Sequence, residues 1–153
     1  MRLSQLLERL EYEVVQGTED IAITTLINDS RKVEPGSVFV CISGAVSDGH
    51  RFATEVADKG AAALIVEKEV EVPGDVTVIR VEDSRYALAL MSAAYFGYPA
   101  NKLKIIGITG TKGKTTTTYM IRSILEEVGR KVGLIGTIEA IIGEKHIPAA
   151  NTT

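Results

Sequence analysis

The sequence predicts an α/β fold in two parts. A first domain with a mixed sheet spans residues 1–98, a linker spans 99–103, and the start of a second domain spans 104–153. Short runs rich in valine and isoleucine alternate with segments whose apolar residues have helical spacing, as expected when helices flank a sheet. Pro99 then ends the periodic pattern, and a new apolar run leads into a glycine-rich turn and a helical segment.

The N-terminal elements can be assigned from their spacing. The four leucines of the first ten residues form one stripe of a short helix. Residues 21–27 resemble a strand, and 34–37 form a turn with Pro35 and Gly36 at its two central positions. Residues 38–42 are apolar throughout, which predicts a strand covered on both faces.

The rest of the first domain continues this alternation. Asp48 can cap a helix that Gly60 ends, and the strands 61–66 and 76–81 follow, separated by an acidic loop. Asp83 or Ser84 then begins a longer helix. The buried positions of the two helices are expected to be Ala53, Val56, Ala57, Ala87, Leu90, Met91 and Ala94.

The second part has the pattern of a βαβ unit followed by a hairpin. A buried strand over 103–108, a helix ended by Gly129 and a strand over 131–135 are expected. The strands 138–142 and 145–147 would form the hairpin. The apolar stripe of the helix would be Ile121, Ile124, Leu125 and Val128. Two parallel strands and one helix cannot bury both sheet faces, so this domain is expected to be incomplete or completed from outside the chain.

Composition narrows the class of protein. Apolar residues make up 45% and charged residues 24% of the chain, and the net charge is −3. No basic run is present, which argues against nucleic acid as a partner. Cys41, the single cysteine, lies in an apolar run and is expected to be a buried core residue of a cytoplasmic protein. No apolar run approaches the about 20 residues of a membrane helix, so no membrane partner is expected.

The glycine-rich turn predicts a phosphate-binding loop. Glycines allow several backbone N–H groups to point into one concavity, and the following helix adds its positive end. Lys114 would reach the β- and γ-phosphates of a nucleotide, and the Thr115 hydroxyl would hold Mg²⁺. The strict motif has glycine where Ile108 stands, and an ordinary strand-to-helix turn is the alternative interpretation. The predicted nucleotide-binding residues are Gly110, Thr111, Lys112, Gly113, Lys114, Thr115 and Thr116.

Residues 109–116 resemble the ATP loop of the Mur ligase family, whose members often have asparagine at the position of Lys112. Three further segments are similar to the members that add the third, diamino acid residue: 28–40, 44–52 with its Asp48-Gly49-His50, and 151–153. The resemblance implies an ATP- and Mg²⁺-dependent, amide-forming ligase of peptidoglycan synthesis. Its substrates would be UDP-N-acetylmuramoyl-L-alanyl-D-glutamate and a diamino acid, meso-diaminopimelate or L-lysine, joined through an acyl phosphate.

The resemblance also implies residue roles. Lys114 would be catalytic, the first domain would bind the UDP-sugar, and the second would be the incomplete start of a P-loop ATPase domain. The residues implied to contact the UDP-sugar substrate are Asn28, Ser30, Ala45, Val46, Ser47, Asn151, Thr152 and Thr153. From the residues alone, a simple Asx turn at Asp29 and Ser30 is the alternative interpretation, and His50 is expected to have a capping or packing role and not a catalytic one.

Two other functions stay open at this point. One is a non-catalytic module that binds a UDP-sugar or a nucleotide. The other is a sibling Mur ligase or a folylpolyglutamate synthetase, although a folate enzyme would not need the segment 28–31. The residues that select the diamino acid are expected outside this chain, which by itself is expected to be inactive as a ligase.

Overall fold

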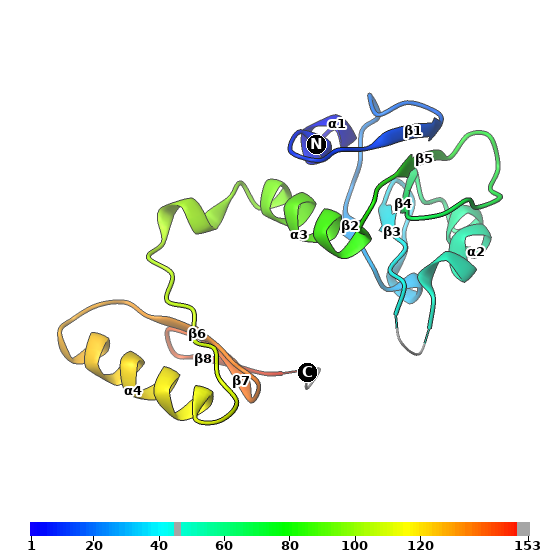
Figure 1. Ribbon diagram of the computed structural model, residues 1–153. Helices are drawn as coiled ribbons and strands as arrows, with labels where there is room; N and C mark the ends of the chain where they lie inside the picture. Colours follow the sequence, from blue (N-terminus) through cyan, green and yellow to red (C-terminus); the bar gives the residue numbers. More distant parts are fainter. Residues whose placement is uncertain (45–46, 150–153) are drawn as a thin grey trace. The chain divides into compact units, whose positions relative to one another are not determined.

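The chain folds into two compact units. The computed structural model describes residues 1–44 and 47–149 (Figure 1). Unit 1 comprises Met1–Leu103 and unit 2 comprises Lys104–Thr153. The 3-10 helix η3 (Pro99–Lys102), where the sequence predicts a linker, lies at the end of unit 1.

Unit 1 contains a five-stranded sheet with the order β1-β5-β4-β3-β2. Strands β2 to β5 run parallel to one another, and β1 pairs with β5 in the antiparallel direction, so the sheet is mixed as predicted. The five strands are β1 (Glu13–Gln16), β2 (Leu26–Ile27), β3 (Val38–Val40), β4 (Ala63–Val66) and β5 (Thr77–Arg80).

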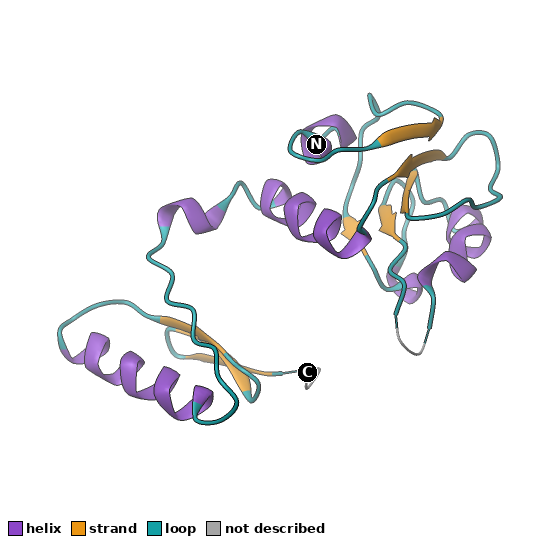
Figure 2. Ribbon diagram, in the orientation of Figure 1, coloured by secondary structure: helices purple, strands orange, loops and turns teal. Residues whose placement is uncertain are grey.

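Helices cover both faces of this sheet (Figures 1 and 2). Val38 and Val40 pack in one apolar cluster with α1 and α3, whereas Phe39 and Cys41 pack in a second cluster with α2. This alternation follows from the two-residue period of a strand. The helices are α1 (Leu3–Leu7), α2 (Ala53–Asp58) and α3 (Ser84–Tyr95), with the 3-10 helices η1 (Ser30–Lys32) and η2 (Gly49–Phe52).

The prediction for Cys41 is confirmed. Its side chain is fully buried, and this burial raises the pKa of the thiol to about 12. Because the thiolate is the reactive form, Cys41 serves as a small apolar core residue and not as a nucleophile. The turn at 34–37 is also present, with Gly36 at a φ of 81° and the Ser37 N–H donating to the Glu34 carbonyl.

The predicted strand at 21–27 is wrong over most of its length. Only Leu26 and Ile27 pair with a neighbouring strand. The Ile23 N–H donates to the Met1 carbonyl, and the Thr24 N–H donates to the Gly36 carbonyl. The backbone hydrogen bonds of this segment therefore go to the N-terminus and to a turn, and a ladder cannot form there. Strand β1, which lies at the sheet edge and is mostly exposed, was not anticipated.

Unit 2 consists of one helix and an antiparallel sheet. Helix α4 (Lys114–Glu127) is followed by β6 (Gly133–Ile135), β7 (Glu139–Ile142) and β8 (Lys145–Pro148), in the order β6-β7-β8. The predicted hairpin is confirmed, since β7 and β8 pair in register from Glu139 opposite Pro148 to Ile142 opposite Lys145.

The predicted βαβ unit is not found. Residues 103–108 form no strand, and β6 pairs with β7 in the antiparallel direction. Ile105 and Ile106 are 70% and 59% exposed, because no described strand of this unit lies beside them to complete a parallel ladder. The apolar stripe of α4 is covered only in part: Ile121 and Leu125 are half-buried, whereas Ile124 and Val128 are exposed.

Candidate functional site

The carboxyl edge of the unit 1 sheet gathers the polar segments of this unit. Strands β2 to β5 are parallel, so the loops that follow them all begin at the same edge. This edge is where α/β proteins commonly bind ligands. Asn28 and Ser30 follow β2, and Ser47 lies in the loop that follows the neighbouring strand β3. The structure thus brings these predicted site segments to one edge.

The segment after β2 is ordered by Asp29. Its Oδ1 accepts hydrogen bonds from the backbone N–H of Arg31 (3.1 Å) and from Arg31 Nε (2.9 Å), and its Oδ2 pairs with Arg31 Nη2 (2.8 Å). These contacts with Arg31 lower the pKa of Asp29 to about 2. The Asx-turn geometry is therefore present, and it leaves Asn28 exposed and Ser30 half-buried. Lys59 Nζ additionally donates to the Ser30 carbonyl at 3.0 Å.

The loop over residues 43–48 is closed by backbone contacts. Ser43 and Asp48 form an antiparallel bridge, and the Gly44 N–H donates to the Ser47 carbonyl at 3.0 Å. Ser47 is exposed. Of the other residues predicted to bind the substrate, Ala45, Val46, Asn151, Thr152 and Thr153 lie outside the described residues.

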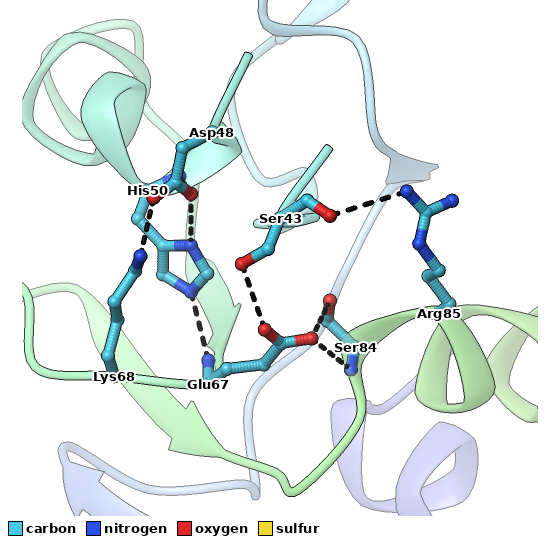
Figure 3. A network of polar contacts seen from close by, with 7 residues as sticks. All are labelled: Ser43, Asp48, His50, Glu67, Lys68, Ser84 and Arg85. Carbon is cyan, nitrogen blue, oxygen red and sulfur yellow. Dashed lines mark hydrogen bonds and ion pairs between the residues drawn. The ribbon is translucent and has the colours of Figure 1, made fainter. Parts of the chain in front are cut away.

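A polar network lies beside this loop (Figure 3). His50 is 8% exposed, and its Nδ1 lies 2.6 Å from Asp48 Oδ1. The backbone N–H of Glu67 donates to His50 Nε2 at 2.9 Å, so Nδ1 carries the ring proton and donates to Asp48. Hydrogen bonds from Lys68 and His50 hold the pKa of Asp48 well below its usual range. The packing role predicted for His50 agrees with these contacts.

The glycine-rich turn of unit 2 leads directly into helix α4. Gly113 is the N-cap of α4 with a φ of 79°, and a Cβ atom there would meet nothing within 4 Å. Gly110 also has a positive φ, of 154°. Lys114 Nζ donates to the Gly110 carbonyl at 2.6 Å, so the ammonium group lies over the loop. Thr115 is half-buried at the start of the helix, one residue after Lys114.

The charges at this helix start favour an anion. The first turn of α4 has no acidic residue and its N-cap has no side-chain hydrogen bond, among the residues that the structure describes. Lys112 and Lys114 lie on the loop, and the positive end of the helix dipole adds to their charge. Over the described ranges, no group of three or more His, Cys, Asp or Glu side chains is placed to hold a metal ion.

Two sequence profiles match the chain, one in each unit. Residues 22–96 match a profile described as Mur ligase family, catalytic domain. Residues 108–153 match a profile described as Mur ligase middle domain. The chain belongs to the Mur ligase family. The resemblance inferred from the sequence is thereby confirmed, and the match to the middle domain begins at the glycine-rich turn of this Mur ligase chain.

Similar proteins of known name are much longer than this Mur ligase chain. The UDP-N-acetylmuramoyl-L-alanyl-D-glutamate–2,6-diaminopimelate ligase of Clostridium perfringens is 51% identical over 153 residues, which are 100% of this chain and 32% of that protein. The chain thus spans about a third of the length of the curated relatives that it matches.

Solved structures share the fold. A UDP-N-acetylmuramoyl-L-alanyl-D-glutamate–2,6-diaminopimelate ligase matches with a TM-score of 0.74 at 24% identity, over 97% of this chain and 30% of that one. The MurF ligase of Thermotoga maritima in complex with ADP matches with a TM-score of 0.52 at 29% identity, over 72% of this chain and 25% of that one.

The described helices were also compared with the length and apolar character of a membrane span. None of them is long and apolar enough to cross a membrane.

Sequence reasoning missed most of the network in Figure 3. The sequence assigns no role to Ser43 or Glu67 and considers Ser84 only as a possible start of a helix, although each stands within three residues of the end of an apolar strand run. That position is a usable signal, because polar residues directly after parallel strands meet at one sheet edge. The contact partners themselves are separated by 17 and 24 positions in the sequence, and only the fold brings them together.

Proposed function

We propose that this chain is the N-terminal part of the Mur ligase that adds diaminopimelate to UDP-N-acetylmuramoyl-L-alanyl-D-glutamate. The observation that carries the proposal is the 51% identity to the clostridial ligase of that name, which covers every residue of the chain. The same identity favours diaminopimelate over L-lysine. Because the chain spans about a third of that protein, the chain alone is proposed to bind substrates without completing the reaction.

In this proposal the loop of unit 2 is the phosphate-binding loop of a P-loop ATPase domain. The backbone at Gly110 to Gly113, Lys114 and the N-terminus of α4 would hold the phosphates, and the Thr115 hydroxyl would hold Mg²⁺. The MurF structure in complex with ADP supports a nucleotide for this family. The remaining loop residues proposed to contact the nucleotide are Thr111, Lys112 and Thr116.

Bound ATP would supply the phosphoryl group that converts the free terminal carboxylate of the substrate to an acyl phosphate, which the amino group of the diamino acid then attacks. The residues of this chain act mainly by positioning and by electrostatics. Lys114, at the positive end of α4, would stabilise negative charge on the phosphate oxygens as the group transfers. The positive φ values of Gly110 and Gly113 let the backbone approach those oxygens closely.

Unit 1 is proposed to bind the UDP part of the substrate at the carboxyl edge of its sheet. Asn28 and Ser30 would contact it from the segment after β2, and Ala45, Val46 and Ser47 from the loop after β3. Among the described residues, the Ser30 hydroxyl makes no hydrogen bond, so it can serve a ligand. Asn151, Thr152 and Thr153 are proposed to contact the muramoyl-peptide part.

Isothermal titration of this chain tests the proposal. UDP-N-acetylmuramoyl-L-alanyl-D-glutamate is expected to bind, and the matching cytidine diphosphate sugar is expected not to bind. Mg-ATP is titrated in a separate cell. Tight ATP binding without any response to the UDP-sugar would contradict the assignment and favour a different phosphate-loop protein. Binding without chemistry in a complete protein that carries this chain would instead favour the non-catalytic module.

A complete ligase that carries this chain distinguishes the sibling enzymes. It is expected to join diaminopimelate to the UDP-muramoyl dipeptide, with formation of ADP and phosphate. Joining D-alanyl-D-alanine to the UDP-muramoyl tripeptide would instead identify a MurF-type ligase. Product masses separate the two reactions without ambiguity.

A further inference from the structure

Glu67 links the segments that follow three neighbouring strands of unit 1 (Figure 3). Its Oε1 accepts hydrogen bonds from Ser84 Oγ (2.6 Å) and the Ser84 backbone N–H (2.9 Å), and its Oε2 accepts one from Ser43 Oγ (2.9 Å). Its own backbone N–H donates to His50 Nε2. Ser43 follows β3, Glu67 follows β4 and Ser84 follows β5.

The same network holds both ends of the 43–48 loop. At the first end, Ser43 donates to Glu67, and the Ser43 carbonyl accepts a hydrogen bond from Arg85 Nη2 at 3.3 Å. At the second end, Asp48 is paired with His50 Nδ1 and with Lys68 Nζ. His50 in turn is fixed by the Glu67 N–H. Both ends of the loop therefore depend on Glu67, one through its carboxylate and the other through its backbone.

Starting helix α3 does not require these contacts. Asp83 is already the N-cap of α3, and its Oδ1 accepts hydrogen bonds from the backbone N–H groups of Arg85 (2.8 Å) and Tyr86 (2.9 Å). If the Glu67 carboxylate only supported helix α3, its hydrogen bond with Ser43 would serve no purpose. The contact between Glu67 and Ser43 instead ties the loop to the sheet edge.

We propose that Glu67 is a positioning residue for the nucleotide-sugar substrate, which acts through Ser43 to hold Gly44 and its hydrogen-bond partner Ser47 in place. The inference rests on the proposed function, in which Ser47 contacts the UDP part of the substrate. In this role Glu67 would act through Ser43 and would not itself contact the substrate. A side chain that is already held in place loses less conformational freedom when the ligand binds, so the network strengthens binding through Ser47 by preorganisation.

A double-mutant cycle on this chain tests the proposal by titration with UDP-N-acetylmuramoyl-L-alanyl-D-glutamate. Ser43→Ala and Glu67→Ala are each expected to weaken binding about five- to tenfold, in line with the loss of one typical intramolecular hydrogen bond. The double variant is expected to bind no more weakly than Glu67→Ala alone. If Ser43→Ala weakens binding by the same factor in both backgrounds, Ser43 contacts the ligand directly and the proposal is wrong.

Two further variants serve as matched controls. Ser84→Ala removes a hydroxyl donor from the same carboxylate but leaves the loop contact, and its affinity is expected to stay within about twofold of the parent. Glu67→Gln keeps the shape, because its amide oxygen can accept from Ser84 and its amide N–H can donate to Ser43 Oγ. Glu67→Gln is expected to bind the UDP-sugar to within about threefold of the parent. It replaces Glu67→Ala in the comparison if Glu67→Ala fails to fold.

Amide hydrogen exchange gives a readout that needs no ligand. The N–H groups of Gly44 and Gly49 donate to the carbonyls of Ser47 and Ile42 at 3.0 and 2.8 Å. Their exchange is expected to accelerate at least fivefold in Ser43→Ala and Glu67→Ala, but not in Ser84→Ala. Unchanged exchange overturns the positioning role. If the parent chain binds no UDP-sugar, the proposed function fails, and exchange alone then decides whether Glu67 fixes the loop.

Discussion

Lys114 lies over the loop that precedes α4, with its ammonium group on the Gly110 carbonyl and its side chain exposed. No core contact depends on it. In a complete ligase that carries this chain, we expect Lys114→Ala to weaken Mg-ATP binding at least tenfold, because a charge-assisted contact to phosphate is lost. Calorimetry measures the affinity, and circular dichroism is expected to stay unchanged. The exposed Lys131 supplies the control variant, Lys131→Ala, and equal losses in both variants would contradict the assignment.

Ser30 offers a second test of a single side chain. Its carbonyl is already held by Lys59, so removing the hydroxyl leaves the η1 turn intact. Ser30→Ala is expected to weaken binding of the UDP-sugar by about 1 kcal/mol, the contribution of one neutral hydrogen bond. Titration with UDP-N-acetylmuramoyl-L-alanyl-D-glutamate measures this loss. An unchanged affinity would place the pocket away from the segment after β2.

Among the helices of unit 1, α3 shows how one cap stabilises an element. Asp83 Oδ1 accepts hydrogen bonds from two backbone N–H groups at the start of the helix, and the buried Ala87 and Met91 pack its inner face on the sheet. We expect Asp83→Ala to lower the free energy of unfolding of unit 1 by about 1 kcal/mol, as for other N-caps. Urea unfolding followed by circular dichroism measures the change. Asp83→Asn keeps a hydrogen-bond acceptor at the N-cap, and its free energy of unfolding is expected to fall much less.

The stability of unit 1 is expected to depend on pH in the acid range, because of the Glu67 carboxylate at the sheet edge. Hydrogen bonds from Ser84 lower the pKa of Glu67 below its ordinary value of 4.5. A carboxyl group whose pKa is lower in the folded state stabilises the fold above its unfolded pKa, and this contribution is lost as the pH falls below it. The stability of Glu67→Gln is therefore expected to change less between about pH 5 and pH 3 than that of the parent.

Urea midpoints measured across that pH window check this prediction. Glu69→Gln is the matched control, because Glu69 is exposed. Its pH profile is expected to follow that of the parent chain. If the urea midpoints of the parent, Glu67→Gln and Glu69→Gln changed identically with pH, Glu67 would contribute nothing to the acid sensitivity of the fold.

Over the whole chain, the two units differ sharply in how much apolar surface they bury. Unit 1 has a core on both sides of its sheet, whereas Leu134 and Ile141 are the only buried hydrophobic residues among the described part of unit 2. Burial of apolar surface is the main stabilising contribution to a fold. The contact of Tyr119 and His146 with Glu139 joins α4 to the hairpin, but these side chains lie near the surface.

This contrast predicts separate behaviour of the two units in hydrogen exchange. The amides of β3, β4 and β5 are expected to be strongly protected, and those of β6, β7 and β8 to exchange at least a hundredfold faster. Mass spectrometry of peptic fragments measures both sets in one experiment. Equal, strong protection in the two units would show that unit 2 is stabilised by contacts beyond those of its own small core.

The sequence by itself determined the local features of this protein. Apolar runs such as 38–42, the turn at Pro35-Gly36 and the cap at Asp83 depend on neighbouring residues. The structure confirms the turn and the cap, and it forms a strand over Val38–Val40 of the run. The family resemblance was readable for the same reason, because its motifs are short and contiguous. The phosphate-loop and UDP-sugar assignments carried with it stay predictions.

Only the tertiary structure decided the pairing of strands and the contacts between distant loops. The strand predicted over 21–27 is limited to Leu26 and Ile27, because the other backbone groups bond near Met1 and Gly36. Residues 103–108 form no strand, because the described residues of unit 2 offer them no parallel neighbour. The linkage of Ser43, Glu67 and Ser84 likewise exists only where the parallel strands end together. Hydrogen bonds between segments far apart in sequence leave no local pattern, so the fold alone reveals them.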